Sequence, residues 1–327
     1  MRLELEKIGA LQQVTTDHDW IWLDLQDDEG DSSGIEQLRR EHPDVRTWLD
    51  MISKQETNYL TVRFPDGREP VLFGSLLYTN SEEMPEKDSC LLLHFYVNRD
   101  KLITINLDDE TRRHLEQQGH LNMLKSAPLA AEGLLVIIRM LMHYLHSGMD
   151  QFEKKLREVE ETMQKNNHKY LMNQIISARF ELLYWSNLFI PCREIAAAVK
   201  EAYLQEIEES PIYLRFLYRG NRMQELIEHY EKEMDTLISI DDAVTAFRGN
   251  DIMKTLTIVT SVFTPATVIG ALWGMNFQRL PWDDLGSVGF ALMCGIILLL
   301  TGGMYFWIRA KGWTGDLLRA KRKNENL

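Results

Sequence analysis

Residues 250–276 of this 327-residue chain read NDIMKTLTIVTSVFTPATVIGALWGMN. The eighteen residues from 256 to 273 carry no charge, and a helix of that length, at about 1.5 Å per residue, nearly matches a hydrocarbon layer about 30 Å thick. The span is rich in hydroxyl groups, because it contains Thr257, Thr260, Ser261, Thr264 and Thr267. We therefore predict a membrane-spanning helix whose polar residues face something other than lipid.

Alternating steps of three and four residues place the small and polar residues of this stretch on one helix face, which we call the seam. The seam consists of Asn250, Met253, Thr257, Thr260, Thr264, Thr267, Ala271 and Gly274, and the same steps lead backwards through Ala246, Ala243, Ser239 and Thr236. Two interpretations are open. The hydroxyls can bond to carbonyls one turn earlier or hold helices together, or several copies of the helix can surround a water-filled pore. The length of the seam, about 57 Å at the helical rise, favours the pore, with Met253 and Leu256 as an apolar constriction near its inner end.

The far end of this helix carries the most specific motif of the chain. It reads Trp273-Gly274-Met275-Asn276-Phe277, with Met253-Lys254 and Pro265 before it and Pro281 after it. At the outer end of the first of two C-terminal spans, this pattern resembles the signature of CorA-type divalent-cation channels. The resemblance implies a homopentameric funnel in which Gly274, Met275 and Asn276 form the ion entrance.

The function that the resemblance implies is passive transport of divalent cations, with Mg²⁺ first and Co²⁺ or Ni²⁺ as further ions, and with no cofactor. Two alternatives stay open: a Zn²⁺ transporter of the same superfamily, and a membrane-anchored scaffold or sensor that conducts nothing. An enzyme is not expected, because the sequence contains no Gly-rich phosphate loop, HExxH or GxSxG motif.

Several positions depart from the family pattern. Gln278 and Arg279 follow the motif where many relatives have a glutamate, and acidity returns only at Asp283 and Asp284, which are candidate metal-attracting residues of the outer loop. Thr264 stands where some relatives carry a bulky apolar side chain. Residues 213–220, YLRFLYRG, resemble the family's YxRDxxDH segment with its acids lost, which argues against closure by Mg²⁺ bound between cytosolic domains.

The rest of the chain reads as an α+β protein with an N-terminal cytosolic α/β domain at 1–107. We predict strands at 2–8, 20–25, 59–64, 71–78, 91–97 and 101–107 and one helix at 35–51. A cytosolic helical region covers 108–208, with a buried helix near 134–145 and a second helix at about 170–207 that Pro191 would kink or divide. After Ser210-Pro211, a helix start signal, the long stalk and pore helix covers 209–273, and an external loop (274–287), a second transmembrane helix (288–308) and a basic tail (309–327) follow.

Charge sets the orientation and excludes one class of partner. Of the net charge of −13, the tail contributes +4 and the loop −1, and residues 250–276 are balanced, which leaves −16 for residues 1–249. The positive-inside rule places the tail, and with it the N-terminal domain, in the cytosol of a cell with the protein in its inner or plasma membrane. Such acidity argues against nucleic acid as a partner and would attract cations near a pore mouth. The expected partners are further copies of the chain, membrane lipid and divalent metal ions.

A second group of potential metal ligands lies in the helical region. His143, His146, Asp150 and Glu153 share one helix face. They can hold a metal ion or form a solvated helix flank, and the absence of an accompanying cysteine or second ligand pair in the sequence favours the flank.

Overall fold

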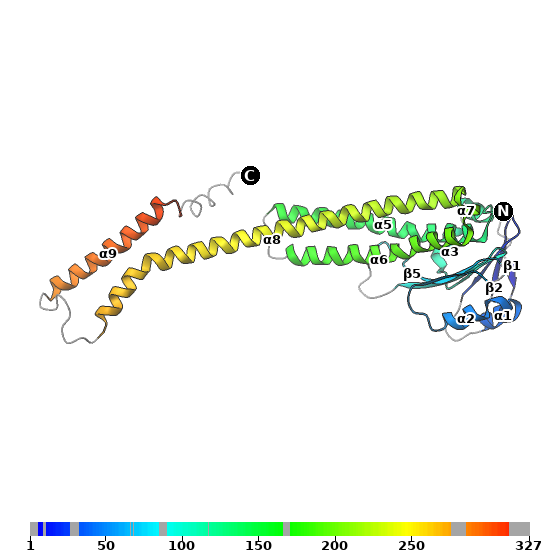
Figure 1. The fold of residues 1–327 in the computed structure, drawn as a ribbon, viewed down its shortest axis with the longest axis horizontal. Coiled ribbons are helices and arrows are strands. Elements are labelled where there is room, and N and C mark those ends of the chain that lie inside the picture. The colour runs from blue at the N-terminus through cyan, green and yellow to red at the C-terminus, as the bar shows by residue number, and fades with distance from the viewer. Residues whose placement is uncertain are drawn as a thin grey trace. The chain divides into compact units, whose positions relative to one another are not determined.

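A computed structural model describes residues 6–8, 11–26, 33–65, 67, 69–84, 90–116, 118–165, 171–275 and 286–313. Its strands are β1 Glu6–Ile8, β2 Leu11–Thr15, β3 Ile21–Leu25, β4 Tyr59–Arg63, β5 Val71–Tyr78, β6 Leu91–Val97 and β7 Lys101–Ile105. Its helices are α1 Ser33–Glu41, η1 Pro43–Val45, α2 Arg46–Ile52, α3 Asp109–Leu115, α4 Gln118–Lys125, α5 Ala130–Gln164, α6 Leu171–Tyr203, α7 Gln205–Glu208, α8 Pro211–Trp273 and α9 Ser287–Ala310 (Figure 1). The chain divides into two compact units, Met1–Leu237 and Ile238–Leu327.

The first unit contains a mixed sheet with the strand order β1-β2-β3-β7-β6-β5-β4. Only β3 and β7 are parallel neighbours, and the other pairs are antiparallel. Strands β5 and β6 have the bounds predicted from their β-branched and apolar runs, whereas β2 was not predicted. Its sequence, LQQVT, alternates too weakly to stand out as a strand, and the pairing with β3 stabilises it.

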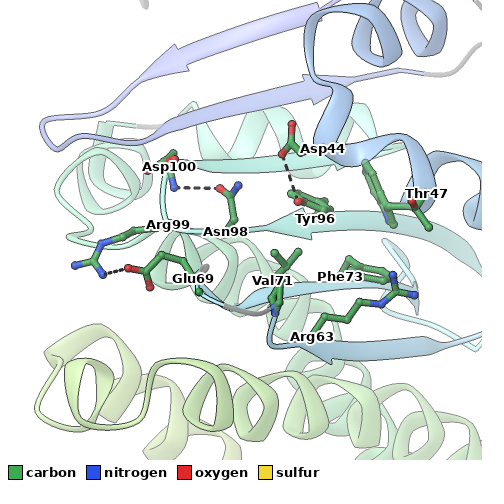
Figure 2. A pocket seen from close by; sticks show the side chains of 13 residues that line it. Asp44, Thr47, Arg63, Glu69, Val71, Phe73, Tyr96, Asn98, Arg99 and Asp100 are labelled. Atoms are coloured by element: carbon green, nitrogen blue, oxygen red, sulfur yellow. Dashed lines mark hydrogen bonds and ion pairs between the residues drawn. The ribbon is translucent and has the colours of Figure 1, made fainter.

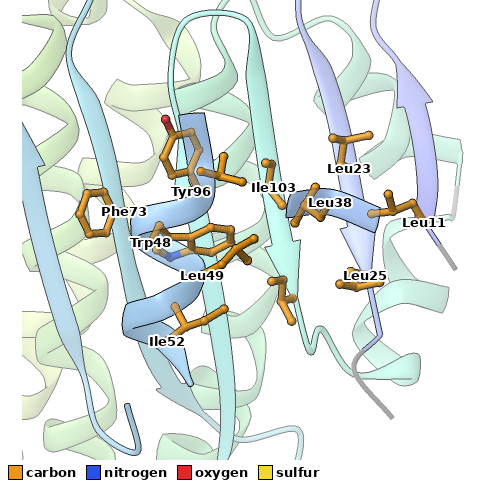
Figure 3. Packing of buried hydrophobic residues seen from close by; sticks show 12 residues of the cluster. Leu11, Leu23, Leu25, Leu38, Trp48, Leu49, Ile52, Phe73, Tyr96 and Ile103 are labelled. Atoms are coloured by element: carbon orange, nitrogen blue, oxygen red, sulfur yellow. The ribbon is translucent and has the colours of Figure 1, made fainter. Parts of the chain in front are cut away.

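One face of the sheet is covered by α1, η1 and α2, which enclose a core around Trp48 and Tyr96 (Figure 3). The two rings lie 5.5 Å apart between centroids. The single helix expected at 35–51 is interrupted, because Pro43 has no N–H to donate and the residue before it, His42, adopts φ −125° and ψ 81°. The chain turns there and presents Leu38 and Trp48 to the same core.

The other face of the sheet is covered by α5 and α6, with α5 against β6 and β7 and α6 against β4 and β5. Trp20 anchors the contact: its indole Nε1 donates to the Ala127 carbonyl at 2.7 Å, and its ring lies so close to Gly133 of α5 that a Cβ there would meet it at 2.4 Å. Gly148 likewise accommodates the Trp185 ring of α6, which a Cβ would meet at 2.3 Å. These two glycines therefore allow bulky indoles to fill the core beside α5.

The first part of α8 completes a helical layer with α5 and α6. Ser210 caps α8, because its hydroxyl accepts from the N–H groups of Ile212 and Tyr213, each at 3.2 Å. Tyr230 then packs edge-on against Phe152 of α5. The helix start predicted at Ser210-Pro211 is confirmed.

Of the two effects expected of Pro191, a kink or a division of the helix, division is wrong. Helix α6 runs unbroken through the proline from Leu171 to Tyr203, and the break comes at Leu204, with φ 41° and ψ −111°. Burial of Pro191 and its neighbours Phe189 and Cys192 indicates that tertiary packing outweighs the missing backbone hydrogen bond here. The second unit holds the remainder of α8 and α9.

Candidate functional site

Two helices of the described chain, α8 and α9, are long and apolar enough to cross a membrane. Neither helix is buried as a core helix of a soluble protein would be. In the most apolar 18 residues of each helix, the buried share is 0% in α8 and 6% in α9. Exposed apolar faces of this extent need lipid or another protein surface to cover them. Both helices therefore fit insertion into a bilayer.

The seam is exposed along its whole length within the chain, from Thr236 to Gly274. The half-buried positions of the same helix form a different row, which includes Asp251, Ile258, Pro265 and Ile269. At about 100° per residue, this row lies on the opposite side of α8 from the seam. Within the part of the chain that the structure describes, the seam is thus an exposed face turned away from the half-buried row.

The seam threonines of the span bond back to their own helix. The hydroxyls of Thr257, Thr264 and Thr267 donate to the carbonyl oxygens four residues earlier, at 2.8, 2.6 and 3.0 Å. Thr260 is within reach of two carbonyls, those of Leu256 at 2.9 Å and Thr257 at 3.0 Å. The hydroxyl bonds to carbonyls one turn earlier are therefore present. They do not cover the seam, because the threonine side chains remain exposed. Each hydroxyl gives up its only proton to the backbone, and its oxygen remains an exposed acceptor.

Below the threonines, the same side of α8 becomes apolar. Met253 and Leu256 are 61% and 55% exposed, although their side chains are among the largest of this region. Both Asp251 and Lys254 are less exposed than these neighbours. Between Asn250 and Gly274, the seam carries amide, hydroxyl, apolar and small side chains, and none of them is charged.

At its C-terminal end, α8 closes with a tightened turn. The Gly274 N–H donates to the Gly270 carbonyl at 2.9 Å, and the Met275 N–H donates to the Leu272 carbonyl at 3.4 Å. A Cβ on Gly274 would lie 3.1 Å from the Gly270 oxygen and 3.6 Å from the Ala271 oxygen. The other predicted site residues of this region, Asn276, Asp283 and Asp284, lie outside the described residues.

The described residues contain no group of three or more His, Cys, Asp or Glu side chains arranged to hold a metal ion. His143, His146, Asp150 and Glu153 are therefore not brought together as a metal site. The Nδ1 atom of His146 lies 3.1 Å from the Met142 carbonyl, and His143 is exposed.

A cavity of about 730 Å³ lies beside η1, α2 and the ends of the β5 and β6 strands (Figure 2). Two of its charged side chains pair with each other, because Arg99 forms an ion pair with Glu69 at 2.9 Å. The Tyr96 hydroxyl donates to Asp44 at 3.4 Å. Burial is the main reason that the pKa of Tyr96 is raised, and the negative charge of the neighbouring Asp44 raises it further. With three acidic side chains (Asp44, Glu69 and Asp100) against Arg63 and Arg99, the charges of the lining nearly cancel.

A second cavity has a lining that comes from four separate helices. Its residues are His114 of α3, His120 of α4, Arg139, Met140 and His143 of α5, and Arg219 of α8. Only the fold brings them together, and no local motif could have indicated it.

Comparison with known proteins gives a consistent result over nearly the whole chain. Residues 17–310 match the family model described as CorA-like Mg2+ transporter protein. The chain is 32% identical over 311 residues to the magnesium transport protein CorA of Bacillus subtilis, covering 95% of this chain and 96% of that protein. It is 23% identical over 296 residues to the zinc transport protein ZntB of Yersinia enterocolitica, covering 83% and 85% of the two chains. The solved structure of the CorA magnesium transporter from Methanocaldococcus jannaschii shares the fold, with a TM-score of 0.65 and 21% identity over 94% of both chains.

Proposed function

Because the chain belongs to the CorA-like Mg2+ transporter family, we propose that several copies of it, five by the family resemblance, assemble around one axis into a passive channel for divalent cations. Mg²⁺ is the principal ion, with Co²⁺ and Ni²⁺ as further ions. The observation that carries the proposal is the seam: a long, uncharged, oxygen-bearing helix face that nothing in the described chain covers.

Assembly follows from the position of the seam on α8. Hydroxyl-bearing faces avoid lipid, because the hydrocarbon offers their oxygens no hydrogen-bond donors. The half-buried row on the opposite side of α8 leaves the seam to face further copies of the same helix. Equivalent helices around an axis then enclose a path lined by Thr257, Thr260, Thr264, Thr267 and Ala271.

The back-bonded hydroxyls suit a hydrated cation. Mg²⁺ loses its water ligands reluctantly, so a pore that conducts it is expected to contact water molecules of the ion's shell rather than replace them. Those waters point their protons outward and need acceptors. The threonine oxygens provide acceptors only, because their protons are bonded to the carbonyls one turn earlier. Neutral oxygens of this kind attract the shell without the strong binding that a ring of carboxylates would produce.

The ion entrance is proposed at the outer end of α8, where Gly274, Met275 and Asn276 follow one another. Converging helix C-termini present the negative end of the helix dipole to an approaching cation. The side-chain carbonyl of Asn276 would add a neutral oxygen from each copy, and the lack of a side chain at Gly274 would let the copies approach closely. Asp283 and Asp284 are proposed as weaker sites of cation attraction in the loop.

The inner constriction is proposed at Met253 and Leu256. Both are apolar and exposed on the seam side, so a ring of them at small radius would exclude water and stop a hydrated ion. The negative charge of residues 1–249 would raise the local concentration of cations at this inner mouth. The proposal places both termini in the cytosol and the protein in the inner or plasma membrane, in agreement with the basic tail.

The test uses purified full-length protein in liposomes and follows the flux of Mg²⁺, Co²⁺, Ni²⁺ and Zn²⁺ with and without a membrane potential. We expect flux of Mg²⁺ driven by the gradient alone, loss of most of it in Asn276→Ala, and slower flux in the isosteric Asn276→Asp, whose charge holds the ion. Flux of Zn²⁺ without Mg²⁺ would favour the zinc alternative. No flux of any ion in the native protein, or equal flux in native protein and Asn276→Ala, would refute the proposed channel.

A further inference from the structure

The second cavity, of about 320 Å³, has an unusual concentration of positive charge for this chain. It is lined by His114, His120, Arg139, Met140, His143 and Arg219, so five of its six lining residues are basic and none is acidic. Residues 1–249 as a whole carry a net charge of −16. With histidine counted as neutral, as in that total, the two arginines give the cavity a charge of +2, and none of the described residues that line it is negative. A basic hollow in so acidic a region points to a ligand of negative charge.

The cations of this cavity lack partners that would neutralise them. No carboxylate lies within ion-pair distance of Arg139, Arg219 or the three histidines in the part of the chain that the structure describes. The Nε atom of Arg219 is buried and has no hydrogen-bond partner among the described residues. The Nη1 atom of Arg139 donates to a weak acceptor, the sulfur atom of Met123, at 3.5 Å. A buried guanidinium N–H without an acceptor is costly unless a ligand supplies one.

The cations also repel one another. Burial lowers the pKa of Arg219, and the charges of Arg139 and Arg222 lower it further. Burial, followed by the charge of Arg139, lowers the pKa of His120. An anion bound between the helices would raise the pKa of Arg219 and that of His120, and it would thereby favour the protonated form of His120.

We propose that this cavity, between α3, α4, α5 and α8, binds a small soluble molecule through its phosphoryl groups. Arginine forks and imidazole N–H groups are well suited to tetrahedral phosphoryl oxygens. The volume lies at the lower end of the range of small-molecule sites, about 300–1,000 Å³, and so accommodates more than one phosphoryl group. The site is separate from the seam and does not depend on the proposed ion channel.

The test measures binding of inorganic pyrophosphate to the full-length protein in detergent by isothermal titration calorimetry, without divalent cations and with chloride balancing the ionic strength. We expect saturable binding of one pyrophosphate per chain, with uptake of protons. Removal of one charged hydrogen-bonding partner by Arg219→Gln or His120→Gln should weaken binding about 10- to 100-fold. Arg215→Gln is the matched control, because Arg215 is exposed on α8, one turn before Arg219, and does not line the cavity.

Two variants on different helices guard against misfolding as an explanation, and the thermal unfolding midpoint of each identifies a variant that fails to fold. Weaker binding in both folded variants, with native affinity in Arg215→Gln, would support the site. Absence of saturable binding to the native protein would overturn the proposal, as would equal affinity in the native protein and both cavity variants.

Discussion

Valine substitutions at two threonines of α8 distinguish the loss of a hydroxyl on the seam from the loss of a hydroxyl elsewhere on the helix. Thr257 lies on the seam and Thr255 does not, yet both side chains are exposed in the chain. Both hydroxyls donate to the carbonyl four residues earlier at 2.8 Å, to Met253 and Asp251 respectively. Replacing either by valine removes the same hydroxyl and the same back-bond and keeps the branched shape. Any difference between Thr257→Val and Thr255→Val therefore reports the direction in which the side chain faces.

The expected difference follows from the acceptors that the ion's water shell loses. One hydrogen bond to a water molecule contributes about 0.5–1.5 kcal/mol net. If two copies of residue 257 contact the shell at once, Thr257→Val raises the barrier by about 1–3 kcal/mol, which slows the flux about 5- to 150-fold. The assay is Mg²⁺ influx into proteoliposomes carrying an internal indicator, normalised to the amount of assembled protein. We expect near-native flux in Thr255→Val, and equal flux in the two variants would refute the assignment of the seam as the pore lining.

Three further outcomes are expected elsewhere in the chain. Gly148→Ala should destabilise the first unit by about 1–3 kcal/mol, because its Cβ would meet the Trp185 ring. Gly220→Ala, where a Cβ meets none of the described atoms within 4 Å, should instead keep or raise the thermal unfolding midpoint, because alanine is favoured over glycine inside a helix; equal midpoints in the two variants would contradict this account. Burial lowers the pKa of His94 from 6.5 to about 4, so its contribution to stability, on the order of 2 kcal/mol, is present above pH 6.5 and is lost as the pH falls toward 4. Denaturant midpoints measured across this range should fall less in His94→Gln than in the native protein, and parallel curves would argue against this role. Leu256→Ser should raise Mg²⁺ flux by wetting the inner constriction, and unchanged or lower flux would place the constriction elsewhere.

The helices that carry the proposed function were predictable from the sequence for a simple reason. The bounds of α8, Pro211–Trp273, follow from the Ser210-Pro211 start and an uninterrupted helical periodicity. Hydroxyl groups at steps of three and four residues fix the composition of one face whatever the tertiary structure is. The exposure of that face and the direction of its hydroxyl bonds needed the structure.

Other features depended on contacts between distant residues. Pro191 would break an isolated helix, but the burial of α6 against α5 and the sheet keeps the helix continuous. Pro43 instead ends α1 at the surface, where no comparable packing opposes it. The basic cavity draws its residues from positions 114 to 219, so its charge pattern is invisible in any short stretch of sequence.

The most direct measurement of a wet axis uses cysteine substitutions in a chain whose Cys90, Cys192 and Cys294 are replaced by alanine. A small, charged, water-soluble thiol reagent is applied to the membrane-inserted protein carrying Thr260→Cys or Val259→Cys, two adjacent positions that are both exposed in the chain. We expect rapid modification at 260, slowed by Mg²⁺, and almost none at 259, because only the first lies on the seam. Modification at 259 with protection at 260, or equal rates at both positions, would contradict a wet axis lined by the seam.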